Sequence, residues 1–173
     1  MRVPDGQDPQ TPFPGFAFFV AFQQAEGGGA FGVFEDVPEP ITGGFSEVTG
    51  LEATMEAKVI KEGGRNYGPV QRAGPTSFST VVLKRGVVAS RQLWAWWSLF
   101  AGADDAPNGG WAFNRADVTI SLIREDETLL GWTLKNAMPV KFRIGDLNAK
   151  GGEVAIEELH LVHEGLYRSP PLP

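Results

Sequence analysis

Residues 83–100 have the sequence LKRGVVASRQLWAWWSLF, and this stretch alone in the chain has the pattern of an amphipathic helix. Four large apolar residues recur there at i, i+3, i+4 and i+7, which places them on one helical face: Leu93, Trp96, Trp97 and Phe100. Ser90 precedes them as a candidate N-cap, and Gly102 follows where a left-handed residue can close a helix. We therefore predict one α-helix over about residues 90–100.

The rest of the chain has the pattern of β-strands that could receive this apolar helical face. Apolar and other residues alternate with period two in residues 16–22, 117–123 and 140–144, among others. Burial of each large helix side chain contributes roughly 1.5–3 kcal/mol, so the helix needs a broad apolar surface beneath it. The residues by themselves predict a mainly β domain with a single flanking helix.

Residues 51–75 contain a well-patterned strand followed by a polar segment. Leu51, Met55 and Val59 alternate with charged residues, which predicts a strand with one buried and one solvent-exposed face. The following segment, residues 61–75, contains four glycines and two prolines and is predicted to be a long loop. Loops of this length are usually functional or disordered.

Apolar residues change phase within residues 154–161, around an adjacent pair of acids. Val154 and Ile156 share one phase of the strand pattern, whereas Leu159 and Leu161 share the other. The acids between them, residues 157 and 158, suggest a β-bulge that restores the buried face.

Composition limits the classes of function. With 173 residues, a formal charge of −6 and no cysteine, the chain suits one domain without disulfides or thiol chemistry. The negative charge argues against sequence-independent nucleic-acid binding, and no specific nucleic-acid recognition is expected. No run of 18 apolar residues occurs, so we expect no stable membrane insertion. Residues 1–14 are proline-rich and are predicted to be a disordered leader.

Candidate chemical motifs are weak throughout the chain. Gly27, Gly29 and Gly32 match a dinucleotide fingerprint, but prolines follow where a helix should begin. His160 and His163 are three residues apart, so in a strand they point to opposite faces and cannot grip one metal ion. No nucleophile motif is present. We therefore expect no catalytic residue, no metal site and no cofactor.

Six segments together resemble the tail-tube family of contractile phages and of phage-tail-like contractile injection systems. They occur in the family's order over about residues 15–166: GFSEVTGLE (44–52), EGGRNYGPVQRAGP (62–75), LKRGV (83–87), SRQLWAWW (90–97), LKNAMPVKF (134–142) and DLNAKGGEVAIEELHLVHEGL (146–166). The chain departs from the family in its longer Gly/Pro-rich segment over residues 26–43 and in its C-terminal SPPLP.

The resemblance implies a fold and a structural function. The fold would be two packed antiparallel sheets forming a barrel-like core with one flanking helix. The domain would span residues 15–166, and residues 167–173 would form a C-terminal tail. The protein would be a non-enzymatic subunit of hexameric rings that stack into a hollow tube, which sheath contraction drives through a target envelope.

The same resemblance implies partners and a location. The partners would be other copies of the chain, sheath subunits, baseplate, spike and tube-terminating proteins, and cargo in the lumen. The protein would be made in the bacterial cytoplasm and then reside in an assembled phage tail or injection particle. Two alternatives are a tube-initiating or baseplate-proximal ring protein of the same family and a free-standing β-barrel that binds a ligand near its tryptophans.

The polar loop over residues 61–74 is the candidate contact between rings. Arg65 and Arg72 could pair with acids of an adjacent ring, and Tyr67 offers a rigid aromatic anchor of the kind that interfaces favour. The resemblance also aligns this segment with the family's inter-ring hairpin. The full set of candidates is Glu62, Arg65, Asn66, Tyr67 and Arg72.

Overall fold

The computed structural model describes residues 17–24, 42–89, 91–102, 115–124, 127–146 and 155–169. The predicted leader at 1–14, residues 26–41 of the Gly/Pro-rich segment, the candidate cap Ser90 and residues 170–173 of the predicted tail lie outside these ranges. The described strands are β1 (Ala17–Gln24), β2 (Thr42–Phe45), β3 (Glu47–Thr49), β4 (Ala53–Ile60), β5 (Val70–Phe78), β6 (Val81–Gly86), β7 (Ala116–Arg124), β8 (Glu127–Ile144), β9 (Ile156–Val162) and β10 (Gly165–Ser169), with one helix, α1 (Gln92–Ala101), between β6 and β7.

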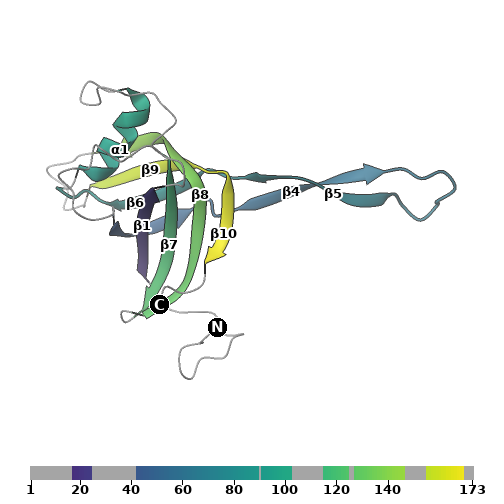
Figure 1. The fold of residues 1–173 in the computed structure, drawn as a ribbon, viewed down its shortest axis with the longest axis horizontal. Helices are drawn as coiled ribbons and strands as arrows, with labels where there is room; N and C mark the ends of the chain where they lie inside the picture. Colours follow the sequence, from purple (N-terminus) through teal and green to yellow (C-terminus); the bar gives the residue numbers. More distant parts are fainter. Residues whose placement is uncertain are drawn as a thin grey trace.

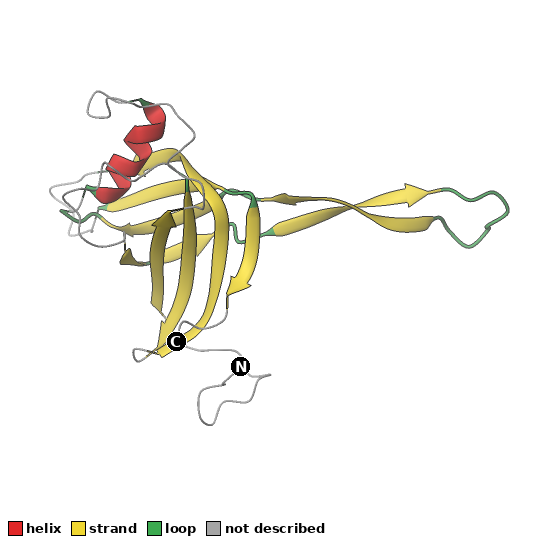
Figure 2. Ribbon diagram, in the orientation of Figure 1, coloured by secondary structure: helices red, strands yellow, loops and turns green. Residues whose placement is uncertain are grey.

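The described strands form two antiparallel sheets of very different size (Figures 1 and 2). The larger sheet has eight strands in the order β2-β1-β7-β8-β9-β6-β3, and β10 pairs with β8 beside this path. The smaller sheet is the β4–β5 ribbon, which projects away from the rest of the molecule (Figure 1). Two antiparallel sheets with one helix confirm the predicted mainly β class.

The predicted barrel-like closure is not found among the described residues. The hydrogen-bonded path of the larger sheet ends at β2 on one side and at β3 on the other. These two strands are consecutive in the chain and are separated only by Ser46, whose backbone N–H donates to the carbonyl of Lys84 in β6. The sheet therefore curls so that its two end strands follow each other directly in the chain. No backbone hydrogen-bond ladder joins β2 to β3 among the described residues.

Strand β8 holds the larger sheet together because it spans two groups of strands. Its first part pairs with β7 on one side and β10 on the other, and its last part pairs with β9. Pro139 does not end the strand, although the register shifts between Pro139 and Lys141. β10 pairs Tyr167 with Thr133, so residues 167–169 belong to a strand and not to the predicted tail.

The core lies between the curled sheet and the helix. Its buried apolar residues come from β1, β2, β6, α1, β7, β8 and β9: Val20, Phe22, Phe45, Val81, Leu83, Leu93, Trp96, Leu99, Ala116, Val118, Ile120, Leu134, Ala137, Leu159 and Leu161. In β6 and β9 every second residue is buried, as the period-two pattern requires. The opposite face carries Lys84, Glu158 and His160, whereas the charged Arg85 and Glu157 lie on the core-facing side.

Helix α1 begins two residues later than its predicted start. Arg91 occupies the N-cap position without a side-chain cap hydrogen bond, and Gly102 closes the helix in the left-handed conformation. Leu93 and Trp96 are fully buried, whereas Trp97 and Phe100 are partly buried against the core. Leu99 is also buried, so the helix presents a broader face than the four-residue stripe drawn from the sequence.

Strand β9 carries no bulge at the acidic pair. Its register with β6 is unbroken from Leu161 to Ile156, so Glu157 stays in phase with the buried Leu159 and Leu161. Ile156 is consequently exposed. The predicted bulge is wrong because a buried carboxylate, and not an apolar residue, occupies the core-facing position of this strand.

Candidate functional site

The β4–β5 ribbon, which we call the arm (residues 53–78), is the most distinctive feature of the molecule. It extends well beyond the body of the protein, and its tip lies at the far end from the helix (Figures 1 and 2). A two-stranded ribbon by itself is at best marginally stable in water, because it has no third layer to cover either face. The described part of the chain supplies no third layer for the arm.

The structure corrects two sequence predictions at the arm. β4 was predicted to bury one face, but Met55 is 57% exposed and Val59 is 52% exposed. The predicted loop over residues 61–75 is shorter than expected, because β5 begins at Val70 and continues through Gly74 and Pro75 to Phe78. The connection at the tip covers residues 61–69. The alternating pattern identified a strand with two unlike faces, but no other described element is folded onto either face.

A glycine allows the arm to be continuous across a bulge. The β4–β5 register shifts between Met55 and Ala57, opposite Gly74 and Pro75. A Cβ atom added at Gly74 would lie 2.3 Å from the carbonyl oxygen of Glu56, far closer than real side chains allow. Only glycine fits this close approach of the two backbones, so Gly74 determines the geometry of the arm at the bulge.

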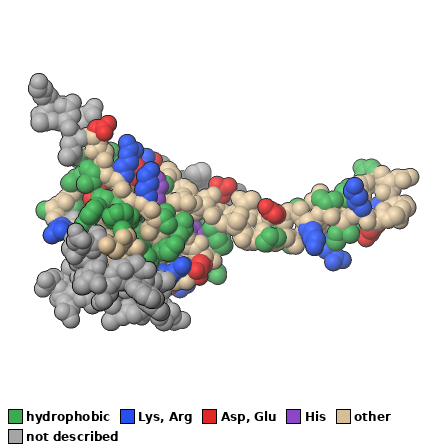
Figure 3. All heavy atoms as spheres, turned by 90° about the horizontal axis from the view of Figure 1, so that it is seen from above, with side chains coloured by type: hydrophobic (Ala, Val, Ile, Leu, Met, Phe, Trp, Pro, Cys, Tyr) green, Lys and Arg blue, Asp and Glu red, His purple; other side chains and the backbone are tan. Residues whose placement is uncertain are grey.

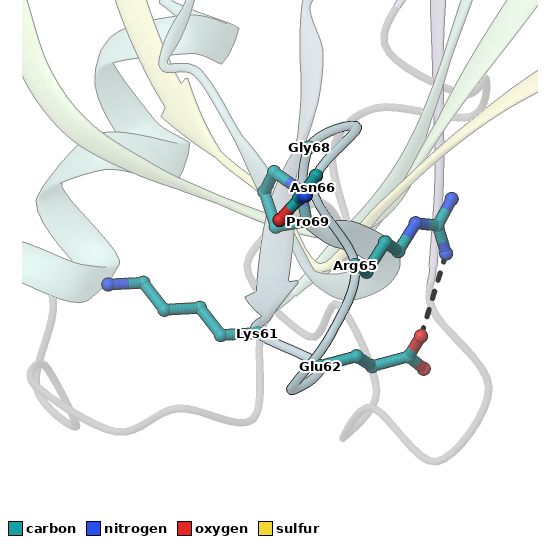
Figure 4. A pocket seen from close by; sticks show the side chains of 6 residues that line it. All are labelled: Lys61, Glu62, Arg65, Asn66, Gly68 and Pro69. Carbon is teal, nitrogen blue, oxygen red and sulfur yellow. Dashed lines mark ion pairs between the residues drawn. The ribbon is translucent and has the colours of Figure 1, made fainter.

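The tip gathers most of the predicted inter-ring residues around a shallow concavity of about 360 Å³ (Figure 4). It is lined by Lys61, Glu62, Arg65, Asn66, Gly68 and Pro69. The Arg65 guanidinium lies 3.6 Å from the Glu62 carboxylate, and both side chains are about half exposed. Gly64 and Gly68 both have positive φ, the conformation that turns in this loop require.

The remaining two candidates lie outside that concavity. Tyr67 is 96% exposed, which is unusual for an aromatic side chain in a free molecule. Arg72 lies in β5, directly opposite Lys58 in β4. The tip therefore presents polar and charged groups with an uncovered aromatic ring, a composition suited to contact with another protein.

His163 lies at the base of the arm. Its imidazole ring is 5.1 Å from the Phe78 ring at the end of β5, and its Nδ1 is 2.9 Å from the carbonyl oxygen of Gly165. Partial burial lowers the pKa of His163, because desolvation disfavours the charged imidazolium. The neutral ring therefore packs where the arm leaves the body and has the role of a structural contact.

The outer face of the larger sheet carries a row of alternating charges. Glu47 in β3, Lys84 in β6, Glu158 in β9 and Arg143 in β8 are directly paired in register from strand to strand. Lys84 Nζ lies 2.9 Å from Glu47, and this hydrogen bond is the main cause that raises the pKa of Lys84. Arg143 lies 3.6 Å from Glu158. The row carries no net formal charge.

Sequence reasoning missed one buried ion pair. Arg85 in β6 and Glu157 in β9 are opposite each other in register, and each is 6% exposed. The guanidinium Nε donates to the carboxylate, and its carbon atom Cζ lies 5.6 Å from the centre of the Phe45 ring. The only sign of this pair in the sequence was Glu157, an acid at a position where the alternating pattern places apolar residues. Its partner is 72 positions away in the chain.

Among the residues that the structure describes, no group of three His, Cys, Asp or Glu side chains could hold a metal ion. His160 lies 3.6 Å from Glu158 on the outer face, whereas His163 lies beyond the end of β9 against Phe78. None of the helices that the structure describes has the length and apolar character to cross a membrane.

Comparison with protein families gives one match over most of the chain. The model described as T4-like virus tail tube protein gp19 matches residues 14–167. The chain belongs to this tail tube family. Its members are structural proteins and not enzymes, in agreement with the prediction from the sequence. Comparison with curated protein sequences gives no match.

Solved structures of similar fold come from contractile particles. A chain in the cryo-EM structure of the anti-feeding prophage (AFP) baseplate is 26% identical, with a TM-score of 0.69 over 92% of this tail tube protein and 97% of that chain. A chain in the sheath–tube complex of the PVC extracellular contractile injection system is 20% identical, with a TM-score of 0.68 over 93% of each chain. A chain in the PVC sheath/tube terminator structure is 20% identical, with a TM-score of 0.66 over 94% of this protein and all of that chain.

Proposed function

We propose that this tail tube protein is the repeating subunit of the inner tube of a contractile phage tail or injection system. Six copies would form a ring, rings would stack into a hollow tube, and contraction of a surrounding sheath would drive the tube through a target envelope. The single observation that carries the proposal is the arm, which extends from a tail tube fold and has no partner among the residues that the structure describes.

In this proposal the arm carries the contact between rings. Glu62, Arg65, Asn66, Tyr67 and Arg72 are the contact candidates near its tip. Exposed edges of the larger sheet would pair between neighbours, because unpaired strand edges otherwise promote uncontrolled association. Sheath subunits would surround the tube, baseplate or spike and terminator proteins would bind its ends, and cargo would occupy its lumen.

A second candidate is a baseplate-proximal ring of the same family, and the relative of 26% identity in the AFP baseplate structure favours it. The two candidates differ in how far the purified protein polymerises. A main tube subunit forms long tubes by itself, whereas a tube-initiating ring stops at one or a few rings without other components.

Electron microscopy of the full chain at rising concentration tests the tube function, and we expect hollow tubes of uniform width. A protein that stays monomeric by sedimentation at every concentration would rule out the tube function. A shortened variant tests the arm: residues 58–72 are replaced by a two-residue Gly-Ser turn. This cut leaves the register intact, because Ala57 and Ala73 are directly opposite each other.

We expect the shortened protein to form rings that do not stack. Its monomer should melt within about 2 °C of the parent, because the removed residues bury almost no surface in the monomer. The dilute monomer's melting curve is the control for folding. Long tubes formed by the shortened protein would show that stacking depends on another part of the chain.

A further inference from the structure

The two faces of the arm differ in charge: one carries no charged residue, and the other carries the charged residues of the two strands. Register places eight residues on one face: Ala53, Met55, Ala57 and Val59 from β4, and Gln71, Ala73, Thr76 and Phe78 from β5. We call these residues the uncharged face. The charged residues of the two strands are Glu56, Lys58 and Arg72. Lys58 and Arg72 pair with each other on the other face, and Glu56 alternates in phase with Lys58.

The uncharged face has the composition of a buried strand face and yet is open. Period-two alternation of apolar with charged residues is the pattern of a sheet with one face covered. Met55 and Val59 are nevertheless both more than half exposed. Phe78, at the base of the arm, packs against His163. Because the described part of the chain leaves the rest of this face open, the pattern points to a cover supplied by another molecule.

A second apolar surface lies at the opposite end of the body. Val87, Val88, Ile144 and Ile156 are each more than 40% exposed. The Val87 N–H donates to the carbonyl of Ala155 and the Gly145 N–H donates to that of Ile156, which brings the four residues to one end of β6, β8 and β9. Ile156 lies on the outer face of the sheet, in phase with Glu158, whereas Ile144 is opposite the buried Glu157, so these residues lie on both faces of the sheet end. We call them the end patch. Space-filling Figure 3 shows hydrophobic side chains both on the arm and on the body.

The arm and the end patch lie at opposite ends of the same strands. The arm joins β6 at Val81, which pairs with Leu161, whereas the end patch adjoins Gly86, which pairs with Ile156. Two complementary surfaces at opposite ends of a molecule form a head-to-tail contact that repeats from copy to copy. Such a contact propagates as a ring or as a filament.

Charge also favours a second copy as the occupant. The arm, residues 53–78, carries four cations and two carboxylates, a formal charge of +2. The whole chain carries −6, so the remainder carries −8. The arm of one copy is therefore drawn electrostatically toward the body of another.

We propose that the uncharged face of the arm docks on the end patch of a second copy of this chain, with Met55 and Val59 packed against Ile156. This inference rests on the proposed tube function and adds the face of the arm that is buried and the surface that receives it. The tip residues then lie beyond the apolar contact, at its polar rim.

Cysteine cross-linking tests the contact directly, because the chain has no native cysteine. One protein carries Val59→Cys and a second carries Ile156→Cys; the two are mixed, assembled and oxidised. The matched control replaces Val59→Cys by Lys58→Cys, which is one residue away on the charged face. We expect a covalent dimer on denaturing gels from the first mixture, at least tenfold more abundant than from the control mixture.

A charge substitution gives a second measurement. Val59→Glu should abolish tubes, whereas Lys58→Glu should leave tubes visible, and both monomers should melt like the parent. Tubes that form normally with Val59→Glu, or equal cross-linking from both mixtures, would overturn the docking face while leaving the tube function standing. Failure of the unmodified protein to assemble at all would overturn the tube function and this contact with it.

Discussion

At the scale of single residues, the buried Arg85–Glu157 pair is the strongest constraint in the core of the body. Both groups are almost fully buried, and the guanidinium also lies over Phe45. One guanidinium nitrogen, Nη2, is buried without a hydrogen-bond partner. Transfer of two charges from water is costly, so the pair is tolerated only while each charge compensates the other.

Removal of one partner should therefore be more damaging than removal of both. Glu157→Ala leaves the Arg85 charge buried and uncompensated, and we expect it to lower the free energy of unfolding by about 3–5 kcal/mol. Arg85→Met combined with Glu157→Leu should cost much less. Urea unfolding of the monomers measures both. A single variant as stable as the double variant would contradict the expected coupling.

The outer-face pair Arg143–Glu158 is the matched control for this experiment. The Arg143 side chain is about half exposed and lies 3.6 Å from Glu158. Exposed ion pairs are screened by water and contribute about 0–1 kcal/mol. Arg143→Ala should accordingly leave the unfolding midpoint nearly unchanged.

At the scale of elements, helix α1 packs on the body through two groups of aromatic contacts. Trp96 is fully buried and meets Phe22 of β1 edge-on, with ring centres 5.4 Å apart and an interplanar angle of 73°. Trp94 and Trp97 lie against each other and against Phe142 of β8. The helix is thus held to two strands that are distant in sequence.

Trp96 should be the most costly helix residue to truncate. Trp96→Ala creates a large cavity between α1 and β1, and we expect a loss of about 3–5 kcal/mol in the free energy of unfolding. Trp94→Ala is the control, because this side chain is 36% exposed, and its cost should be clearly smaller. Chemical denaturation of the two variants makes the comparison, and equal losses would mean that α1 packs differently on the sheet.

The sequence predicted elements well where a pattern is local. The spacing of Leu93, Trp96, Trp97 and Phe100 located the helix to within two residues, and the alternation in β7 placed Val118, Ile120 and Leu122 on the buried face. The alternation around Met55 also separated two unlike faces correctly. It could not show that the described part of the chain leaves one of these faces open, because alternation indicates that a face is buried and does not identify what buries it.

Contacts between residues that are distant in the sequence could not be predicted from these local patterns. Glu157 was interpreted as a sign of a bulge, because its cation lies on a strand 72 positions earlier. The predicted closure into a barrel likewise depended on strand pairing and not on local spacing, and the described ladder stays open between β2 and β3. The candidate site was therefore predictable as a segment, whereas its shape as a projecting arm was not.

At the scale of the whole molecule, charge is divided unequally between the arm and the body. The arm carries a formal charge of +2 and the remainder −8. In a stacked tube, arms that contact neighbouring copies would hold their cations at the rims of the interfaces. The surfaces left for the bore and the outer wall would then be supplied mainly by the acidic body.

This division predicts the electrostatics of the proposed bore. Six copies carry a formal charge of −36, six times −6. The charge-paired row across β3, β6, β9 and β8 adds nothing to the net charge of whichever surface presents it. We therefore expect an inner wall that is net acidic or near neutral, along which an acidic cargo slides without adhering. A cryo-EM reconstruction of the assembled tube shows which side chains face the lumen, and a bore dominated by Lys and Arg would overturn this expectation.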